Sequence, residues 1–123
     1  MTPTASVTAH EGSAAATGKA GALGRPDATL SRDQMVATIA ELGPVFDERA
    51  VITDREASFP WGNFNDLRER GFLALCVPKE YGGMGASYAD YMRVSEEIGR
   101  HCGSTGLTFN MHNATMIWAG EVA

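Results

Sequence analysis

The chain has 123 residues, of which 44% are apolar, 20% charged and 8% aromatic, a composition typical of one small globular domain. Ten basic against fifteen acidic side chains give a net charge of -5, which argues against a surface that neutralises nucleic-acid phosphates. No apolar run approaches the roughly 20 residues that cross a bilayer, and the N-terminus has no compact apolar segment behind a basic flank. We therefore expect a cytoplasmic protein with no membrane span and no nucleic-acid partner.

The cysteines and histidines do not suggest a metal site. Cys76 and Cys102 are too few and too far apart for a disulfide framework or a CxxC site, and the three histidines are scattered. We predict no metal and two reduced, mostly buried thiols. His10 is assigned to an N-terminal tail and His101 to a loop.

Residues 1–30 are dominated by Ala, Gly, Thr and Ser and carry almost no large apolar side chains. Such a stretch cannot bury enough surface to offset its conformational entropy, so we predict a disordered tail followed by an ordered domain over residues 31–123. A transit peptide would be Arg-rich and poor in acids, which this tail is not, although a targeting role stays open.

The first helix is expected to begin at Ser31, because Ser31 and Gln34 have the spacing of a capping box. Apolar residues then recur at helical spacing: Met35, Val36, Ile39, Ala40 and Leu42. Gly43-Pro44 is expected to end this helix or to kink it sharply.

A second amphipathic segment is expected before Phe59-Pro60, which stops it. Its inward face is predicted to hold Val45, Phe46, Arg49, Ile52 and Thr53. A short helix between Asn63 and Arg70 should follow, with Phe64 and Leu67 pointing inward and Gly71 as a left-handed C-terminal cap.

The apolar run from Phe72 to Val77 is too short for a helix, and we predict a buried extended connection into Pro78. Ser87 and Asp90 form another capping box, which opens a helix that fades at Gly99. The expected inward residues of this helix are Tyr91, Met92, Val94, Ser95 and Ile98. Adjacent carboxylates at Glu96-Glu97 are interpreted as a solvated helix face.

Ser104 is predicted to cap the last helix, on which Leu107, Met111, Thr115 and Trp118 share one side. His112 is most often a satisfied or pocket-lining side chain in such a position, and less often an acid or base. The helix carries no stop signal before residue 123, and a bundle of this size is marginal alone. We predict an all-α, orthogonal or up-down bundle of about five helices that forms the first piece of a larger protein.

Three glycines within four positions, Gly82, Gly83 and Gly85, lie between the apolar run and the helix that Ser87 opens. They permit positive φ and very close backbone approach, and an ordinary tight turn needs only one. We interpret this loop as architecture that sets the relative position of the helices. Glu80 places a negative charge in it, which a phosphate group would not favour.

With these motifs the chain resembles the flavin-dependent acyl-CoA dehydrogenases. Their N-terminal helical domain characteristically reads Asp-x-x-x-x-Phe-Pro, then Leu-x-x-x-Gly-Leu/Phe-Leu-x-Leu-x-Val/Ile-Pro, then Glu-x-Gly-Gly-x-Gly. The matching residues here are Asp54, Phe59, Pro60, Leu67, Gly71, Phe72, Leu73, Leu75, Val77, Pro78, Glu80, Gly82, Gly83 and Gly85, with Tyr81 inside the last motif. A Val-x-Glu-Glu-Ile-Gly/Ala-Arg helix and a Ser-containing turn follow in the family, and here Val94 to Arg100 and Ser104 fit them.

The resemblance implies a larger protein with this helical domain, a middle β-barrel that holds much of the FAD, and a C-terminal four-helix bundle that supplies a catalytic Glu. In such an enzyme that Glu takes a proton from the α-carbon of an acyl-CoA thioester, and a hydride passes from the β-carbon to the flavin. The chain ends before the barrel, so we expect no catalytic residue in it, no activity of the chain alone and no flavin binding by it. An electron-transfer flavoprotein or oxygen is the expected acceptor, and the full-length protein is expected to be a homo-oligomer.

The resemblance further implies that the helix after the Ser turn borders the acyl chain. Leu107, Met111, His112 and Thr115 are therefore the candidate substrate-binding residues. Two alternatives stay open: a flavin monooxygenase or nitroalkane-oxidising relative on the same scaffold, and a free-standing helical interaction module that uses the edge around Met116, Ile117 and Trp118.

Overall fold

The computed structural model describes residues 30–122, and the predicted tail over residues 1–30 lies outside them except for Leu30, which packs against the core. In this part of the chain there are four α-helices, two single 3-10 turns and no strand, so the all-α prediction is confirmed. The elements are α1 (Arg32–Glu56), α2 (Trp61–Glu69), η2 (Phe72–Ala74), η3 (Lys79–Tyr81), α3 (Tyr88–His101) and α4 (Gly103–Val122).

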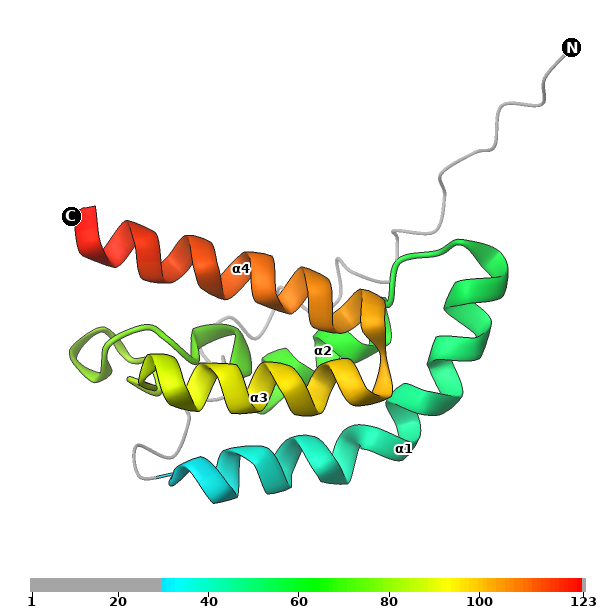
Figure 1. Cartoon of the computed structure of the whole chain (residues 1–123), viewed down its shortest axis with the longest axis horizontal. Helices are drawn as coiled ribbons and strands as arrows, with labels where there is room; N and C mark the ends of the chain where they lie inside the picture. The colour runs from blue at the N-terminus through cyan, green and yellow to red at the C-terminus, as the bar shows by residue number, and fades with distance from the viewer. Residues whose placement is uncertain (1–29, 123) are drawn as a thin grey trace, which may run out of the picture.

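Helix α1 begins with the predicted capping box, in which the Ser31 hydroxyl accepts from the Gln34 amide and the Gln34 side chain accepts from the Ser31 amide. Of the two outcomes predicted for Gly43-Pro44, an end of the helix is wrong and a sharp kink is confirmed. Pro44 lies inside α1, and Figure 1 shows the helix turning sharply near its middle without a break. A proline removes one backbone donor and clashes with one carbonyl, which bends a helix when other contacts hold both halves. The two helices predicted before and after Gly43-Pro44 are therefore one continuous helix, α1.

The second half of α1 buries less than the sequence predicts. Phe46 is fully buried, as expected, but Val45 and Ile52 are exposed. Figure 1 shows this half of α1 turning away from α3, beside which the first half runs. The two aliphatic side chains therefore stay outside.

Helix α3 lies in the middle of the domain, with α1 packed on one side and α4 on the other (Figure 1). The core fills the space between these helices, α2 and the segment around η2. Its buried apolar members are Met35, Ile39, Phe46, Leu67, Phe72, Leu75, Met84, Tyr91, Val94, Ile98, Cys102 and Phe109. Among the residues that we expected inside, Met92 is exposed.

The segment between α2 and α3 is compact, so the prediction of an extended connection from Phe72 to Val77 is wrong. Phe72 begins a 3-10 turn and Leu75 has helical dihedral angles. Both side chains are fully buried, and a spacing of three residues puts them on one side of such a turn. Gly71 before it has a φ of 80°, as its predicted capping role requires.

Helices α3 and α4 meet at a tight corner. The predicted capping box of Ser87 and Asp90 opens α3, which runs through Gly99 to His101. Only Cys102 separates the two helices, so Ser104 lies in the first turn of α4 and is not its cap. A Cβ on Gly106 would lie 2.8 Å from the Gly99 Cα, so the two backbones touch where the helices cross.

Candidate functional site

One side of α4 is apolar and faces away from the core. Its exposed residues follow each other at spacings of three and four along the helix, and we call them the outward stripe: Leu107, Met111, Thr115, Trp118 and Val122. The exposed fractions of Leu107 and Met111 are 66% and 61%. The Thr115 hydroxyl donates to the Met111 carbonyl at 2.9 Å, so even the polar member has its hydrogen bond inside the helix. The sequence correctly predicted that these residues share a side.

His112 points elsewhere. Its ring is half-buried, and Nε2 lies 2.7 Å from the Leu73 carbonyl oxygen in η2. Because a carbonyl can only accept, Nε2 carries the proton in this contact. The structure thus brings Leu107, Met111 and Thr115 together on the open side of α4, and it anchors His112 between α4 and the η2 segment.

Two further polar side chains of α4 are hydrogen-bonded, Asn110 to α3 and Asn113 within α4 itself. The Tyr91 hydroxyl of α3 donates to Asn110, and burial raises the pKa of Tyr91. Asn113 is fully buried; its amide group donates to the Phe109 carbonyl, and its Oδ1 has no partner among the described residues. Together with Phe109, these residues hold the inner side of α4 in place.

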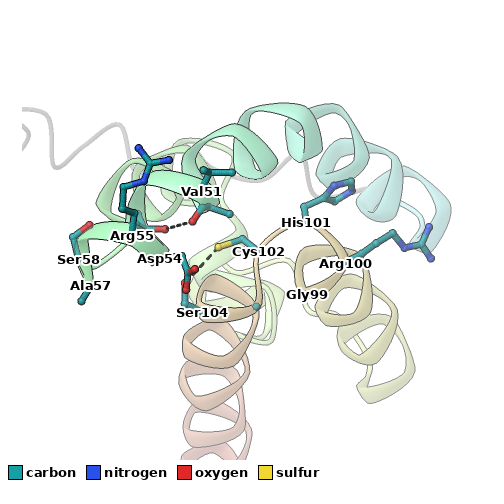
Figure 2. A pocket seen from close by; sticks show the side chains of 13 residues that line it. Val51, Asp54, Arg55, Ala57, Ser58, Gly99, Arg100, His101, Cys102 and Ser104 are labelled. Atoms are coloured by element: carbon teal, nitrogen blue, oxygen red, sulfur yellow. Dashed lines mark hydrogen bonds between the residues drawn. The ribbon is translucent and has the colours of Figure 1, made fainter.

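An open groove of about 880 Å³ lies between the end of α1 and the α3–α4 corner (Figure 2). Its walls include Asp54, Arg55, Arg100, Cys102 and Ser104. Figure 2 shows the Arg55 and Arg100 side chains extending away from each other at opposite ends of the groove. They do not converge on one point, so the groove offers no ready cradle for a phosphate group.

A buried chain of hydrogen bonds runs to this groove from the surface. Arg49 pairs with Asp66 at 2.5 Å and donates to Asn63 Oδ1 at 3.2 Å. The amide of Asn63 donates to the Thr105 hydroxyl at 2.9 Å, and that hydroxyl donates to the Cys102 sulfur at 3.1 Å. These contacts tie α1, α2 and α4 together. Sequence reasoning missed the links between helices, because Arg49 and Asp66 lie 17 residues apart and Asn63 and Thr105 lie 42 residues apart, which leaves no local pattern.

The pKa values of the two thiols are shifted in opposite directions. Both cysteines are free; Cys76 is half-buried and Cys102 is buried, as predicted. Burial raises the pKa of Cys76 to about 11. Burial also acts to raise the pKa of Cys102, but hydrogen bonds from Ser104 and Thr105 outweigh it and the pKa lies below the ordinary value. Within residues 30–122 no group of His, Cys, Asp and Glu side chains could hold a metal ion.

The glycine-rich loop is filled by its own chain. Gly82 and Gly85 have φ angles of 87° and 61°, and a Cβ on Gly83 would lie 2.0 Å from the Val77 carbonyl oxygen. The space next to Gly83 is therefore taken by backbone, and the loop leaves no room there for a phosphate. Neither this loop nor the groove fits the pyrophosphate of FAD.

Two charged residues differ from the sequence interpretation. His101 is the last residue of α3 and not part of a loop, and it contacts Asp47 and Glu97. The Glu97 side chain is only 12% exposed, whereas Glu96 is exposed as expected. Glu96 is therefore solvated as predicted, whereas Glu97 packs inside the structure, because the two side chains point in different directions on the helix.

The described residues form an all-α domain with an exposed apolar side on α4. The family model "Acyl-CoA dehydrogenase, N-terminal domain" matches residues 28–120, which is most of the chain. The chain therefore belongs to the acyl-CoA dehydrogenase family and contains the N-terminal domain of that family.

Several curated proteins are similar to this chain. The 3-sulfinopropanoyl-CoA desulfinase of Cupriavidus necator is 41% identical over 61 residues, which are 50% of this chain and 15% of that protein. The short-chain specific acyl-CoA dehydrogenase of Mus musculus mitochondria is 39% identical over 74 residues, 60% of this chain and 17% of that protein. The 3-(aryl)acrylate reductase of Clostridium sporogenes is 34% identical over 76 residues, which are 62% of this chain and 19% of that protein.

The chain is thus similar to a minor part of each of these relatives, between 15% and 19% of their length. No solved structure matches it with significance. No helix within residues 30–122 combines the length and the apolar character needed to span a membrane.

Proposed function

We propose that this chain is the N-terminal part of a FAD-dependent acyl-CoA dehydrogenase-type oxidoreductase, in which it contributes part of the wall of the acyl pocket. The family match supports the enzyme class. The names of two relatives, a short-chain specific acyl-CoA dehydrogenase and a CoA-thioester desulfinase, support a CoA thioester as the substrate class.

The single observation that carries the pocket wall is the outward stripe. A pocket for an acyl chain needs an apolar surface that excludes water, with few polar groups. Leu107, Met111 and Thr115 provide such a surface on a rigid helix, and the hydroxyl of Thr115 is already hydrogen-bonded. His112 belongs to the proposal as the residue that anchors this wall to the η2 segment through Leu73.

FAD and the catalytic carboxylate belong to other parts of the protein in this proposal. The described residues form no site that fits the flavin's pyrophosphate, since Gly83 is packed against Val77 and the groove arginines diverge. A middle barrel and a C-terminal helical bundle, as the family resemblance implies, would hold the cofactor and the base. The acceptor would be an electron-transfer flavoprotein or oxygen, and the enzyme a cytoplasmic homo-oligomer.

The desulfinase relatives favour a second candidate. Relatives of that name from Cupriavidus, Paraburkholderia and Variovorax are 36% to 42% identical to this chain. The candidate reaction is then cleavage of the C–S bond of 3-sulfinopropanoyl-CoA by water, in which a hydrogen replaces sulfur on the carbon and the sulfinate leaves as sulfite. Because both candidates take a CoA thioester, the wall on α4 serves either one.

The test uses the full-length enzyme and a Met111→Trp variant, which fills the open side of α4. We expect KM to rise more for longer than for shorter acyl-CoA substrates, because a longer chain has more atoms that can meet the added ring. The matched control is Met92→Trp, which enlarges an exposed methionine on α3. An unchanged chain-length profile in Met111→Trp would show that α4 does not border the acyl chain.

The reaction class is decided on the same wild-type enzyme. Anaerobic bleaching of the flavin by a saturated acyl-CoA would support the dehydrogenase. Loss of the sulfinate group from 3-sulfinopropanoyl-CoA without such bleaching would support the second candidate.

A further inference from the structure

The His101 side chain joins two helices. It stands at the end of α3, its side chain is 17% exposed, and its ring lies against the backbone of α1. A Cβ on Gly43 would come within 2.5 Å of the ring carbon Cε1, so the glycine leaves the space that the imidazole occupies. This contact lies beside Pro44, where an uninterrupted α1 has lost a backbone hydrogen bond.

Both ring nitrogens of His101 face carboxylates. Nδ1 lies 3.2 Å from each oxygen of Asp47 in α1, and Nε2 lies 3.1 Å from Glu97 Oε1, one turn earlier in α3. An ionised carboxylate only accepts hydrogen bonds, and a neutral imidazole donates from one nitrogen alone. Only the doubly protonated imidazolium can donate to both partners, so the observed geometry is that of a cation between two anions.

The charged groups around the ring favour the cation on balance. Asp47 faces it from α1 and Glu97 from α3, while Arg100 reaches the other oxygen of Glu97 at 3.6 Å. The first two turns of α4 carry no charged side chain, and the thiol of Cys102 is hydrogen-bonded by Ser104 and Thr105. Burial acts to lower the pKa of His101, but the hydrogen bonds to Glu97 and Asp47 outweigh it and the pKa is raised.

We propose that His101 is a pH-sensitive link between α1 and α3, closed when its imidazolium bridges Asp47 and Glu97 and weakened when the ring loses its proton. Loss of the proton leaves one ring nitrogen with its lone pair facing a carboxylate. Because the pKa of His101 is higher in the folded than in the unfolded chain, the link contributes fully below the unfolded pKa. Its contribution is lost as the pH rises through the folded pKa.

The first test is a proton and nitrogen NMR titration of the histidine rings in the full chain, assigned with His→Gln variants. We expect the midpoint of His101 in the folded chain to exceed its midpoint in the urea-unfolded chain. Glu97→Gln and Asp47→Asn should each lower the folded midpoint. The matched control is Glu96→Gln, which removes the neighbouring exposed carboxylate and should leave the midpoint in place. A folded midpoint equal to or below the unfolded one overturns the proposal.

The second test follows urea unfolding by circular dichroism from pH 5 to pH 9. Between the two midpoints the unfolding constant of the wild-type chain should rise tenfold for each pH unit, which is the linkage for one proton. His101→Gln should remove this dependence. If His101→Gln is too unstable to measure, Asp47→Asn should narrow the pH range of the dependence. A dependence that persists unchanged in either variant overturns the link.

Discussion

Helices α3 and α4 are separated by one residue and bury one side each in the same core, but their other sides differ. On α3, Arg93 pairs with Glu96 and Arg100 pairs with Glu97 along the outer side of the helix. The outward stripe of α4 has no charged residue, and its largest side chain, Trp118, is 68% exposed. The charged outer side of α3 is a typical solvent-exposed surface, whereas the apolar outer side of α4 is typical of a surface that contacts an apolar partner. Burial of the inner sides therefore explains the fold, and the difference between the outer sides points to the function.

The largest effect is expected from the inner side of α4. Phe109→Ala removes a fully buried ring and should cost about 3 to 5 kcal/mol in the free energy of unfolding, by lost burial and by the cavity left behind. Urea unfolding followed by circular dichroism measures this loss. The control, Met111→Ala on the outward stripe, should change the free energy by no more than about 0.5 kcal/mol. Equal losses in the two variants would contradict the division of α4 into two sides.

A smaller effect is expected from the glycine-rich loop that α3 follows. A Cβ in Gly83→Ala would meet the Val77 carbonyl at 2.0 Å, so the backbone must shift, at a cost of about 1 to 3 kcal/mol. Gly120→Ala is the control, because a Cβ there meets nothing within 4 Å. Thermal unfolding should show a lower melting temperature for the first variant and no loss for the second. If Gly83→Ala melts like the wild type, the loop can rearrange and does not fix the start of α3.

The smallest effect distinguishes how the two helices begin. Ser87→Ala removes the cap of α3 and should cost about 1 kcal/mol. Ser104→Ala, in the first turn of α4, should cost less, since Ser104 is not a cap. The pair is compared by urea unfolding at one pH. A greater loss in Ser104→Ala would show that the start of α4 depends on this hydroxyl.

Local patterns correctly predicted the starts of α1 and α3, but not that of α4, whose predicted cap Ser104 lies inside the helix. The capping boxes at Ser31 and Ser87 depend on residues three positions apart, so the sequence contains all their partners. The fate of Gly43-Pro44 depends on His101, 58 residues further along, and no local pattern shows that its ring fills the space beside Gly43. The turn at Phe72 was misinterpreted for a related reason. A short apolar run is compatible with both an extended segment and a tight turn, and only its buried partners in the fold distinguish the two.

The candidate site also contains residues whose placement the sequence predicts and one whose placement it does not. Helical spacing alone put Leu107, Met111 and Thr115 on one side of α4, and the structure leaves that side open. Spacing could not show that His112, next to Met111, turns to the Leu73 carbonyl. That contact depends on how the η2 segment packs under α4, which is a tertiary feature.

Because its backbone touches α3 at Gly106 and Gly99, α4 tolerates mutation less at its start than at its end near Val122. Near the corner with α3, any side chain at Gly106 would force two helices apart, so substitutions there change the whole domain. Toward Val122 the helix is exposed, and substitutions there change only the surface that it offers. A protein built in this way can vary the far end of α4, and with it the shape of whatever that end borders, without altering the crossing that holds the helix in place.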